Sequence, residues 1–385
     1  MVALGVTQTV SWASSYYLPA ILAVPMAREL GVPSSRVFAA FTFALIVMAF
    51  AGTIVGRQID KLGGRIVLSL SHVVIAGGLV MLATASGVWS MAAGWTVLGI
   101  GMAMGLYDAA FAALVGFYGK AARAPITGVT LIAGFASTIG WPIHAIIEQS
   151  YGWRTACLVW AAVHLLVCLP VSLAAFPRAG RPMDQSDASN PVAEQATDSR
   201  ERVRVTMWLM ALLFAAAWFV TGSMAVHLPR LLEGFGASTT SAIAAAALVG
   251  PAQVAARLVD FGLLRHVHPL ASARIATLLH PLGAAALAML GAPAVIAFAL
   301  LHGAGNGILT IVRGTLPLAF FGAQGYGLRQ GLISAPARMS QAFAPFLFGL
   351  VLEASLLWAV ALSSALMLAS FCLLWMLRWP NEPPV

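Results

Sequence analysis

The ten residues 56–65, GRQIDKLGGR, are a charged and glycine-rich stretch that lies between two long apolar segments. Apolar runs of about 20 residues are long enough to span the bilayer core as helices. We therefore expect this stretch to form a loop at a membrane surface, with glycines that allow a sharp turn. Asp60 can pair with a neighbouring arginine, or accept hydrogen bonds from the start of the next helix.

The composition indicates a polytopic helical membrane protein. The chain has 385 residues, of which 60% are hydrophobic and only 9% charged, whereas soluble domains carry about 25% charged residues. The net charge of +8 comes from basic residues scattered over the loops rather than gathered in a stripe, so a nucleic-acid partner is not expected. We expect no removed signal peptide, because the chain enters an apolar segment without a basic region before it.

The three cysteines, Cys157, Cys168 and Cys372, lie inside apolar segments without C-x-x-C spacing. This pattern indicates neither a disulfide framework nor a metal site, and we interpret the cysteines as small packing residues. No cofactor is expected.

Hydrophobic periodicity predicts an all-α membrane protein with twelve spans in two groups of six. The expected spans are 3–27, 37–56, 66–86, 90–118, 124–148, 154–176, 207–231, 238–260, 272–290, 292–318, 327–352 and 355–377. The expected domains are an N-terminal six-helix bundle (1–176), a polar cytoplasmic linker (177–206) and a C-terminal six-helix bundle (207–385).

The distribution of Lys and Arg predicts that both termini are cytoplasmic. With that orientation, the inside loops and helix ends hold 15 of the 21 basic residues. These are Arg57, Lys61, Arg65, Lys120, Arg123, Arg178, Arg181, Arg200, Arg202, Arg204, Arg257, Arg265, Arg274, Arg329 and Arg378. We expect the membrane to be a bacterial inner membrane.

The two halves contain a partial repeat. Residues 56–60 align with 256–260 at an offset of 200, and Arg65 aligns with Arg265. Gly128 and Pro142 in span five match Gly331 and Pro345 in span eleven at an offset of 203. Internal duplication is typical of transporter folds, and the two halves are expected to be pseudo-symmetric.

The pattern G-x-x-x-D-x-x-G-G-R in 56–65 resembles the loop between helices two and three of the major facilitator superfamily of secondary transporters. With six plus six spans and the repeat, the resemblance covers essentially the whole chain. It implies that the two halves rock about a central site in alternating access, and that spans one, four, seven and ten line a cavity. It also implies a gating role for loop residues of both halves, namely Gly56, Arg57, Asp60, Gly64, Arg65, Arg257 and Asp260. The second copy lacks the Gly-Gly pair.

Three ionisable residues fall clearly within spans: Asp108 in span four, Arg313 in span ten and Arg338 in span eleven. Ionisable groups are costly in lipid and usually mark a solute pathway. Our hypothesis is that Asp108 is a gate or proton-coupling carboxylate, paired with Arg313 across the two halves, and that the arginines attract an anionic substrate. The alternative is that these residues only cap or pair locally.

Supporting polar candidates lie in the same spans, although each alone is more often an interhelical hydrogen-bond partner than a ligand. They are Gln8, Tyr16, Tyr17, His227, Asn306 and Gln341.

Three function classes remain open. The first is a secondary transporter of a small organic anion, such as a carboxylate, in which protons can be the coupling ion. Charge placement makes it resemble monocarboxylate-type porters. The second is drug efflux by proton antiport, weakened because Trp95 replaces the expected arginine and 140–142 reads Gly-Trp-Pro. The third is a receptor on a transporter scaffold, although 177–206 is short for a signalling domain. No catalytic motif is present, so an enzyme is not expected; we expect a monomer.

Overall fold

The computed structural model describes residues 1–176, 195–263 and 267–377, and every regular element in these ranges is a helix. The expected linker lies outside the described residues up to position 194, and from Gln195 onward the chain is helical. Four basic residues used to predict the orientation also lie outside them: Arg178, Arg181, Arg265 and Arg378. The chain divides into two compact units, residues 1–184 with 323–332 and residues 185–322 with 333–385.

The first unit contains the helices before residue 176. They are α1 (Val2–Ser11), η1 (Trp12–Tyr16), α2 (Pro19–Glu29), α3 (Ser34–Leu62), α4 (Gly64–Ala83), α5 (Val88–Gly105), α6 (Tyr107–Tyr118), η2 (Gly119–Ala122), α7 (Arg123–Ala133), α8 (Ala136–Val163), η3 (His164–Cys168) and α9 (Leu169–Ala175).

The second unit contains the later helices. They are α10 (Gln195–Gly234), α11 (Thr239–Ala247), α12 (Val249–Gly262), α13 (Pro269–Leu290), η5 (Ala292–Ala294), α14 (Val295–Phe321) and α16 (Leu356–Met376). Helix α15 (Tyr326–Ala354) begins among residues 323–332 of the first unit and continues in the second.

The helices of the described ranges provide the twelve predicted membrane crossings. Eight helical stretches are long and apolar enough to cross a membrane by length and composition, and one of them, Val88–Ala175, has 88 residues and accommodates several crossings. Inside it, the backbone leaves helical geometry at Leu106 and at Gly152, where φ is +82°. Large apolar side chains such as Phe50 and Ile54 on α3 are exposed, as expected for helices that face lipid.

The predicted loop 56–65 is shorter than expected. Residues 56–62 complete α3, and Gly64 already starts α4, so the connection is the single residue Gly63. Gly63 has φ +82°, a region that favours glycine, and this allows an abrupt reversal without further loop residues. The expectation of a ten-residue turn was therefore wrong.

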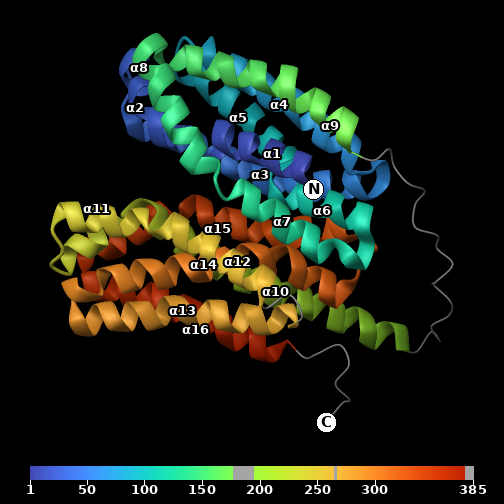
Figure 1. The fold of residues 1–385 in the computed structure, drawn as a ribbon, viewed down its shortest axis with the longest axis vertical. Helices are drawn as coiled ribbons and strands as arrows, with labels where there is room; N and C mark the ends of the chain where they lie inside the picture. Colours follow the sequence, from blue (N-terminus) through green and yellow to red (C-terminus); the bar gives the residue numbers. More distant parts are fainter. Residues whose placement is uncertain (177–194, 264–266, 378–385) are drawn as a thin grey trace. The chain divides into compact units, whose positions relative to one another are not determined.

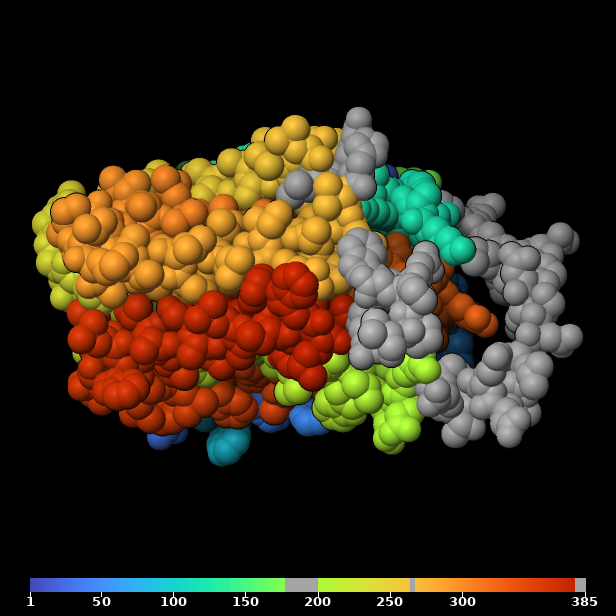
Figure 2. Space-filling view, turned by 90° about the horizontal axis from the view of Figure 1, so that it is seen from below, coloured from blue at the N-terminus to red at the C-terminus, as the bar shows by residue number. Residues whose placement is uncertain are grey.

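Each unit has its own packed core. In the first unit, α4 lies against α5, α8 and α9, and Figure 1 shows these helices together. In the second, α13 lies against α14 and α16, and α12 against α14. Figure 2 shows α13 in orange and α16 in red adjoining on one face of this unit. Helix α14 is largely enclosed, with buried residues from Val295 to Leu318, and Arg313 is one of them.

Candidate functional site

Asp108 lies at a break in the fourth predicted span. Helix α5 ends at Gly105, Leu106 is extended (φ −90°, ψ −172°), and α6 begins at Tyr107, so that Asp108 lies in the first turn of a new helix. The amide groups at a helix start favour a negative charge. Gln330, at the start of α15 in the same unit, donates from Nε2 to Oδ1 of Asp108 over 3.2 Å.

Gln8 makes a hydrogen bond at the same break between α5 and α6. Its Nε2 donates to the carbonyl of Gly105, at the end of α5. A helix that stops inside a membrane leaves carbonyls without intrahelical partners, and such groups need other donors. The predicted residue Gln8 therefore has a structural role in holding the broken helix.

Tyr16 and Tyr17 belong to an aromatic cluster at the end of the π-helical segment η1. The ring of Trp12 lies 5.1 Å from Tyr16 and 4.8 Å from Tyr107, the residue before Asp108. Tyr17 lies 5.9 Å from Trp141. The cluster joins three of the predicted spans next to the α5–α6 break, and sequence reasoning missed Trp12, Tyr107 and Trp141 because single aromatic residues in apolar segments are common.

Arg313 is enclosed in the second unit, with 1% of its surface exposed. Its guanidinium lies 4.8 Å from the centre of the Trp218 ring, and its Nε donates to Oγ of Ser334 over 3.3 Å. A cation over the face of a tryptophan is attracted by the negative face of the ring. Asp108 belongs to the first unit, so the salt bridge expected between the two residues stays a prediction.

Arg338 is also buried, with 2% exposed. Its Nη1 donates to Oε1 of Gln341 over 3.0 Å, so the structure brings two predicted residues together on α15. The other polar candidates of the second unit make local hydrogen bonds. His227 donates from Nε2 to the carbonyl of Pro345 over 2.8 Å, and Oδ1 of Asn306 accepts from Thr221 over 3.0 Å.

The buried charge of the second unit is positive. Among its described residues, the buried charged side chains are Arg257, Asp260, Arg313 and Arg338. Three arginines and one aspartate give three minus one, a formal excess of +2. Arg257 donates to Gly307, Gln253 and Thr310. Arg257 and Asp260, predicted to belong to the gating loop of the second half, are buried within the helix α12 and not in a surface loop. Their gating role stays a prediction.

The residues of the first half that were predicted to gate the transporter lie around the α3–α4 connection. The carboxylate of Asp60 accepts from the amides of Gly327 and Leu328, both over 2.8 Å. It therefore caps α15 and not the next helix in the chain. Gly64 lies against Ala113 so closely that a Cβ would overlap with it. Arg65 donates to the carbonyl of Leu173 over 2.5 Å. Arg57 is exposed.

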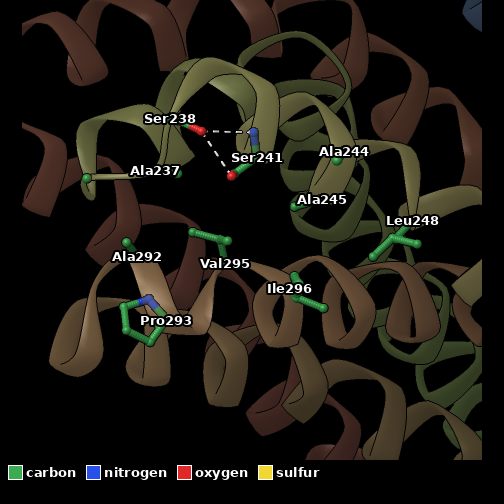
Figure 3. A pocket seen from close by; sticks show the side chains of 11 residues that line it. Ala237, Ser238, Ser241, Ala244, Ala245, Leu248, Ala292, Pro293, Val295 and Ile296 are labelled. Atoms are coloured by element: carbon green, nitrogen blue, oxygen red, sulfur yellow. Dashed lines mark hydrogen bonds between the residues drawn. The ribbon is translucent and has the colours of Figure 1, made fainter.

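The second unit also has a hollow of about 580 Å³ between residues 236–248, which contain α11, and residues 292–296, which contain the start of α14. Figure 3 shows that alanine, valine, isoleucine and proline side chains line most of it. Its two hydroxyl groups, on Ser238 and Ser241, bond to each other over 3.0 Å. The hollow contains none of the predicted site residues and offers no charge to an ionic substrate.

Comparisons with known proteins agree with this architecture. A family model described as Major Facilitator Superfamily matches residues 4–293. None of the curated proteins matches the chain.

Several solved structures share the fold. A variant of the Escherichia coli fucose:proton symporter FucP has a TM-score of 0.74 at 17% identity, with 97% of each chain covered. The human organic anion transporter TETRAN has a TM-score of 0.71 at 15% identity, with 97% of each chain covered. The proton:xylose symporter XylE has a TM-score of 0.74 at 14% identity, covering 97% of this chain and 95% of its own.

Proposed function

Because the chain belongs to the Major Facilitator Superfamily of membrane transporters, we propose that it is a secondary transporter of small organic anions such as carboxylates. It works by alternating access, with Asp108 as the proton-coupling group. It functions as a monomer in a bacterial inner membrane, with both termini cytoplasmic.

The observation that carries this proposal is the buried positive excess of the second unit. Burying a guanidinium in a membrane protein is costly, and such groups are retained where they serve a solute pathway. Arg313 contacts the Trp218 ring and Ser334, and Arg338 donates to Gln341. A carboxylate substrate can take both oxygens to one guanidinium and neutralise it.

One of the similar structures is that of an organic anion transporter. The organic anion transporter TETRAN shares the fold over 97% of this chain. A positive site inside the same scaffold is the feature that an anion substrate requires.

The α5–α6 break supports a coupling role for Asp108. The carboxylate lies at a helix start inside the fourth span and accepts a hydrogen bond from the side-chain amide of Gln330. A carboxylate inside a span whose surroundings change between two states can take up a proton in one state and release it in the other, as a proton-coupled cycle requires.

The contact of Asp60 with the start of α15 supports a gating role for 56–65. The carboxylate satisfies two amides at that helix end. Holding and releasing α15 in this way gives the cytoplasmic side a closed state and an open state.

The direct test is ligand-induced thermal stabilisation of the purified protein. A ligand that binds only the folded state at about 100 times its Kd adds about 2.7 kcal/mol to its stability. We expect lactate, pyruvate or succinate to raise the unfolding midpoint, and Arg338→Ala to abolish that rise. Arg204→Ala is the matched control, because that arginine is 72% exposed. A rise that survives in Arg338→Ala would contradict the role of this residue.

A sugar is the second candidate, favoured by the aromatic cluster around Trp12 and Tyr107. Aromatic faces suit the apolar faces of sugars, and two of the similar structures are sugar symporters. Fucose and xylose therefore belong in the same panel, together with a lipophilic cation to test for drug efflux. Stabilisation by a sugar but by no carboxylate would replace the anion proposal.

A further inference from the structure

Two histidines and a cysteine meet inside the first unit, in residues to which the proposed function assigns no role. His72 comes from α4, and His164 and Cys168 are the first and last residues of η3. Their potential ligand atoms all lie within 4.8 Å of one another, and the residues are 3%, 0% and 1% exposed. We propose that this cluster binds a monovalent copper ion, Cu⁺.

The two imidazole rings are oriented as metal ligands are. Nδ1 of His72 and Nδ1 of His164 face each other at 3.1 Å. The other nitrogen of each ring is hydrogen-bonded to a serine hydroxyl. Nε2 of His72 lies 2.9 Å from Oγ of Ser172, and Nε2 of His164 lies 2.7 Å from Oγ of Ser14. In metal sites, the second ring nitrogen of a histidine ligand is almost always held by such a partner, which fixes the ring.

The separation of the two Nδ1 atoms fits one shared ion. At the usual imidazole–metal distance of about 2.0–2.1 Å, nitrogens 3.1 Å apart subtend an angle of about 98° at the metal. Without a metal, one Nδ1 must carry a hydrogen that points at the other. The ion takes the place of that hydrogen, and each Nε2–H then donates to its serine, since a hydroxyl oxygen can accept as well as donate.

Charge decides between the ions that suit this ligand set. Imidazole and thiolate ligands select Zn²⁺ or Cu⁺. The Cys168 thiol loses its proton to solvent on binding, so Cu⁺ with one thiolate is neutral, whereas Zn²⁺ leaves one positive charge in the interior. A net charge in a buried membrane site is costly. Structural zinc also takes four ligands as a rule, and this cluster supplies three.

The local backbone is unusual on both sides of the cluster. The segment that contains His164 and Cys168 is a π-helix, and so is the segment Trp12–Tyr16 that contains Ser14. π-helical turns are rare and are frequently found at functional sites. The two π-helical segments place His164 and Cys168 beside the hydroxyl of Ser14. A bound ion would link α4 to η3.

The test is an anaerobic titration of the full-length protein with Cu⁺, in competition with the chromophoric chelator bathocuproine disulfonate. A Cys372→Ser background removes the exposed thiol, which could bind copper by itself. We expect this protein to take one equivalent of Cu⁺ from the chelator and Cys168→Ser to take none. Cys157→Ser is the matched control, because Cys157 is a buried cysteine of the same unit outside the cluster, and it should bind as the background does.

Thermal unfolding is the second readout, because it shows whether each variant is folded. Cu⁺ should raise the thermal unfolding midpoint of the background protein and leave that of Cys168→Ser unchanged. Ser14→Ala removes only the support of His164 and should lower the affinity about 10- to 100-fold. The proposal is overturned if the background protein takes no Cu⁺, if Cys168→Ser retains it, or if Zn²⁺ binds more tightly than Cu⁺.

Discussion

Asp60 accepts a hydrogen bond of 2.8 Å from the backbone amide of Gly327, 267 residues further along the chain. The second carboxylate oxygen accepts from Leu328 over the same distance. These amides belong to the first turn of α15, where helix N–H groups have no intrahelical partner and favour negative charge. One side chain at the end of α3 therefore holds the start of α15 by both hydrogen bonding and charge.

Replacing Asp60 by asparagine should weaken this hold without unfolding the protein. The amide keeps one acceptor, but its NH₂ group then faces one of the two backbone N–H donors. The loss of the charge–dipole attraction and of one bond should cost about 0.5–2 kcal/mol. We expect several-fold slower transport in proteoliposomes with little change in folded yield. Unchanged turnover would contradict the gating role of Asp60.

The close approach of α3 and α15 gives a steric prediction. A Cβ on Gly56 would overlap with the backbone carbonyl of Gly327, which cannot move aside as a flexible side chain can. Gly56→Ala should therefore destabilise the protein by about 1–3 kcal/mol, seen as a lower thermal unfolding midpoint. Gly77→Ala is the control, because Gly77 lies in a helix with open space around it and alanine there should stabilise by about 0.5–1 kcal/mol. Equal effects of the two substitutions would contradict the packing explanation.

The fold could be predicted from the sequence because a bilayer allows few solutions. Apolar runs of spanning length must be helices, and the positions of 56–65 and of the internal repeat indicated two related halves. What the pattern could not indicate was the interruption of those helices. Leu106 is an ordinary apolar residue, yet the chain breaks there, and the preceding carbonyl of Gly105 accepts a hydrogen bond from Gln8 of a distant helix.

The candidate site was predictable only in part. Charged residues inside spans are rare, so Arg313 and Arg338 could be selected directly, and both are buried. Gln341, the partner of Arg338, was among the polar candidates, but Trp218 beside Arg313 could not be selected, since it resembles other tryptophans of apolar helices. The His72–His164–Cys168 cluster was missed for a related reason: only His164 and Cys168 are close in sequence, and their H-x-x-x-C spacing within a span was the available signal.

An ion pair outside the spans gives a prediction about pH. Glu29 at the end of α2 accepts from Nε of Arg154 over 2.7 Å and from Nε1 of Trp153 over 2.6 Å. The hydrogen bond from Arg154 lowers the pKa of Glu29 below its ordinary 4.5. A carboxyl group whose pKa is lowered in the folded state stabilises that state above its unfolded pKa, and the effect disappears as the pH falls through the lowered value.

Glu29→Gln should therefore lower the unfolding midpoint at pH 7. The change should be small, because the Glu29–Arg154 pair is partly exposed and exposed ion pairs contribute little to stability. The difference between variant and parent should shrink as the pH falls from 4.5 through the lowered pKa of Glu29, below which the carboxyl group is protonated in both states. Thermal unfolding measured from pH 7 to pH 3 checks this. A difference that stays constant over the whole range would show that hydrogen bonding to the neutral group, and not its charge, stabilises this end of the first unit.

The role of Asp108 can be separated from that of the substrate site. If its carboxylate carries the proton, Asp108→Asn should abolish uphill accumulation driven by a proton gradient, while exchange of substrate across the membrane continues. Both reactions can be measured in proteoliposomes with the carboxylate that gives the largest thermal stabilisation. Gln330→Leu is the matched control, because it removes the 3.2 Å hydrogen bond to Asp108 and keeps the carboxylate. It should slow accumulation and exchange by similar factors.

If Asp108→Asn instead retained the parent's accumulation ratio, the coupling proton would have to bind elsewhere. Loss of exchange as well as accumulation would mean that Asp108 contacts the substrate or holds the α5–α6 break in place.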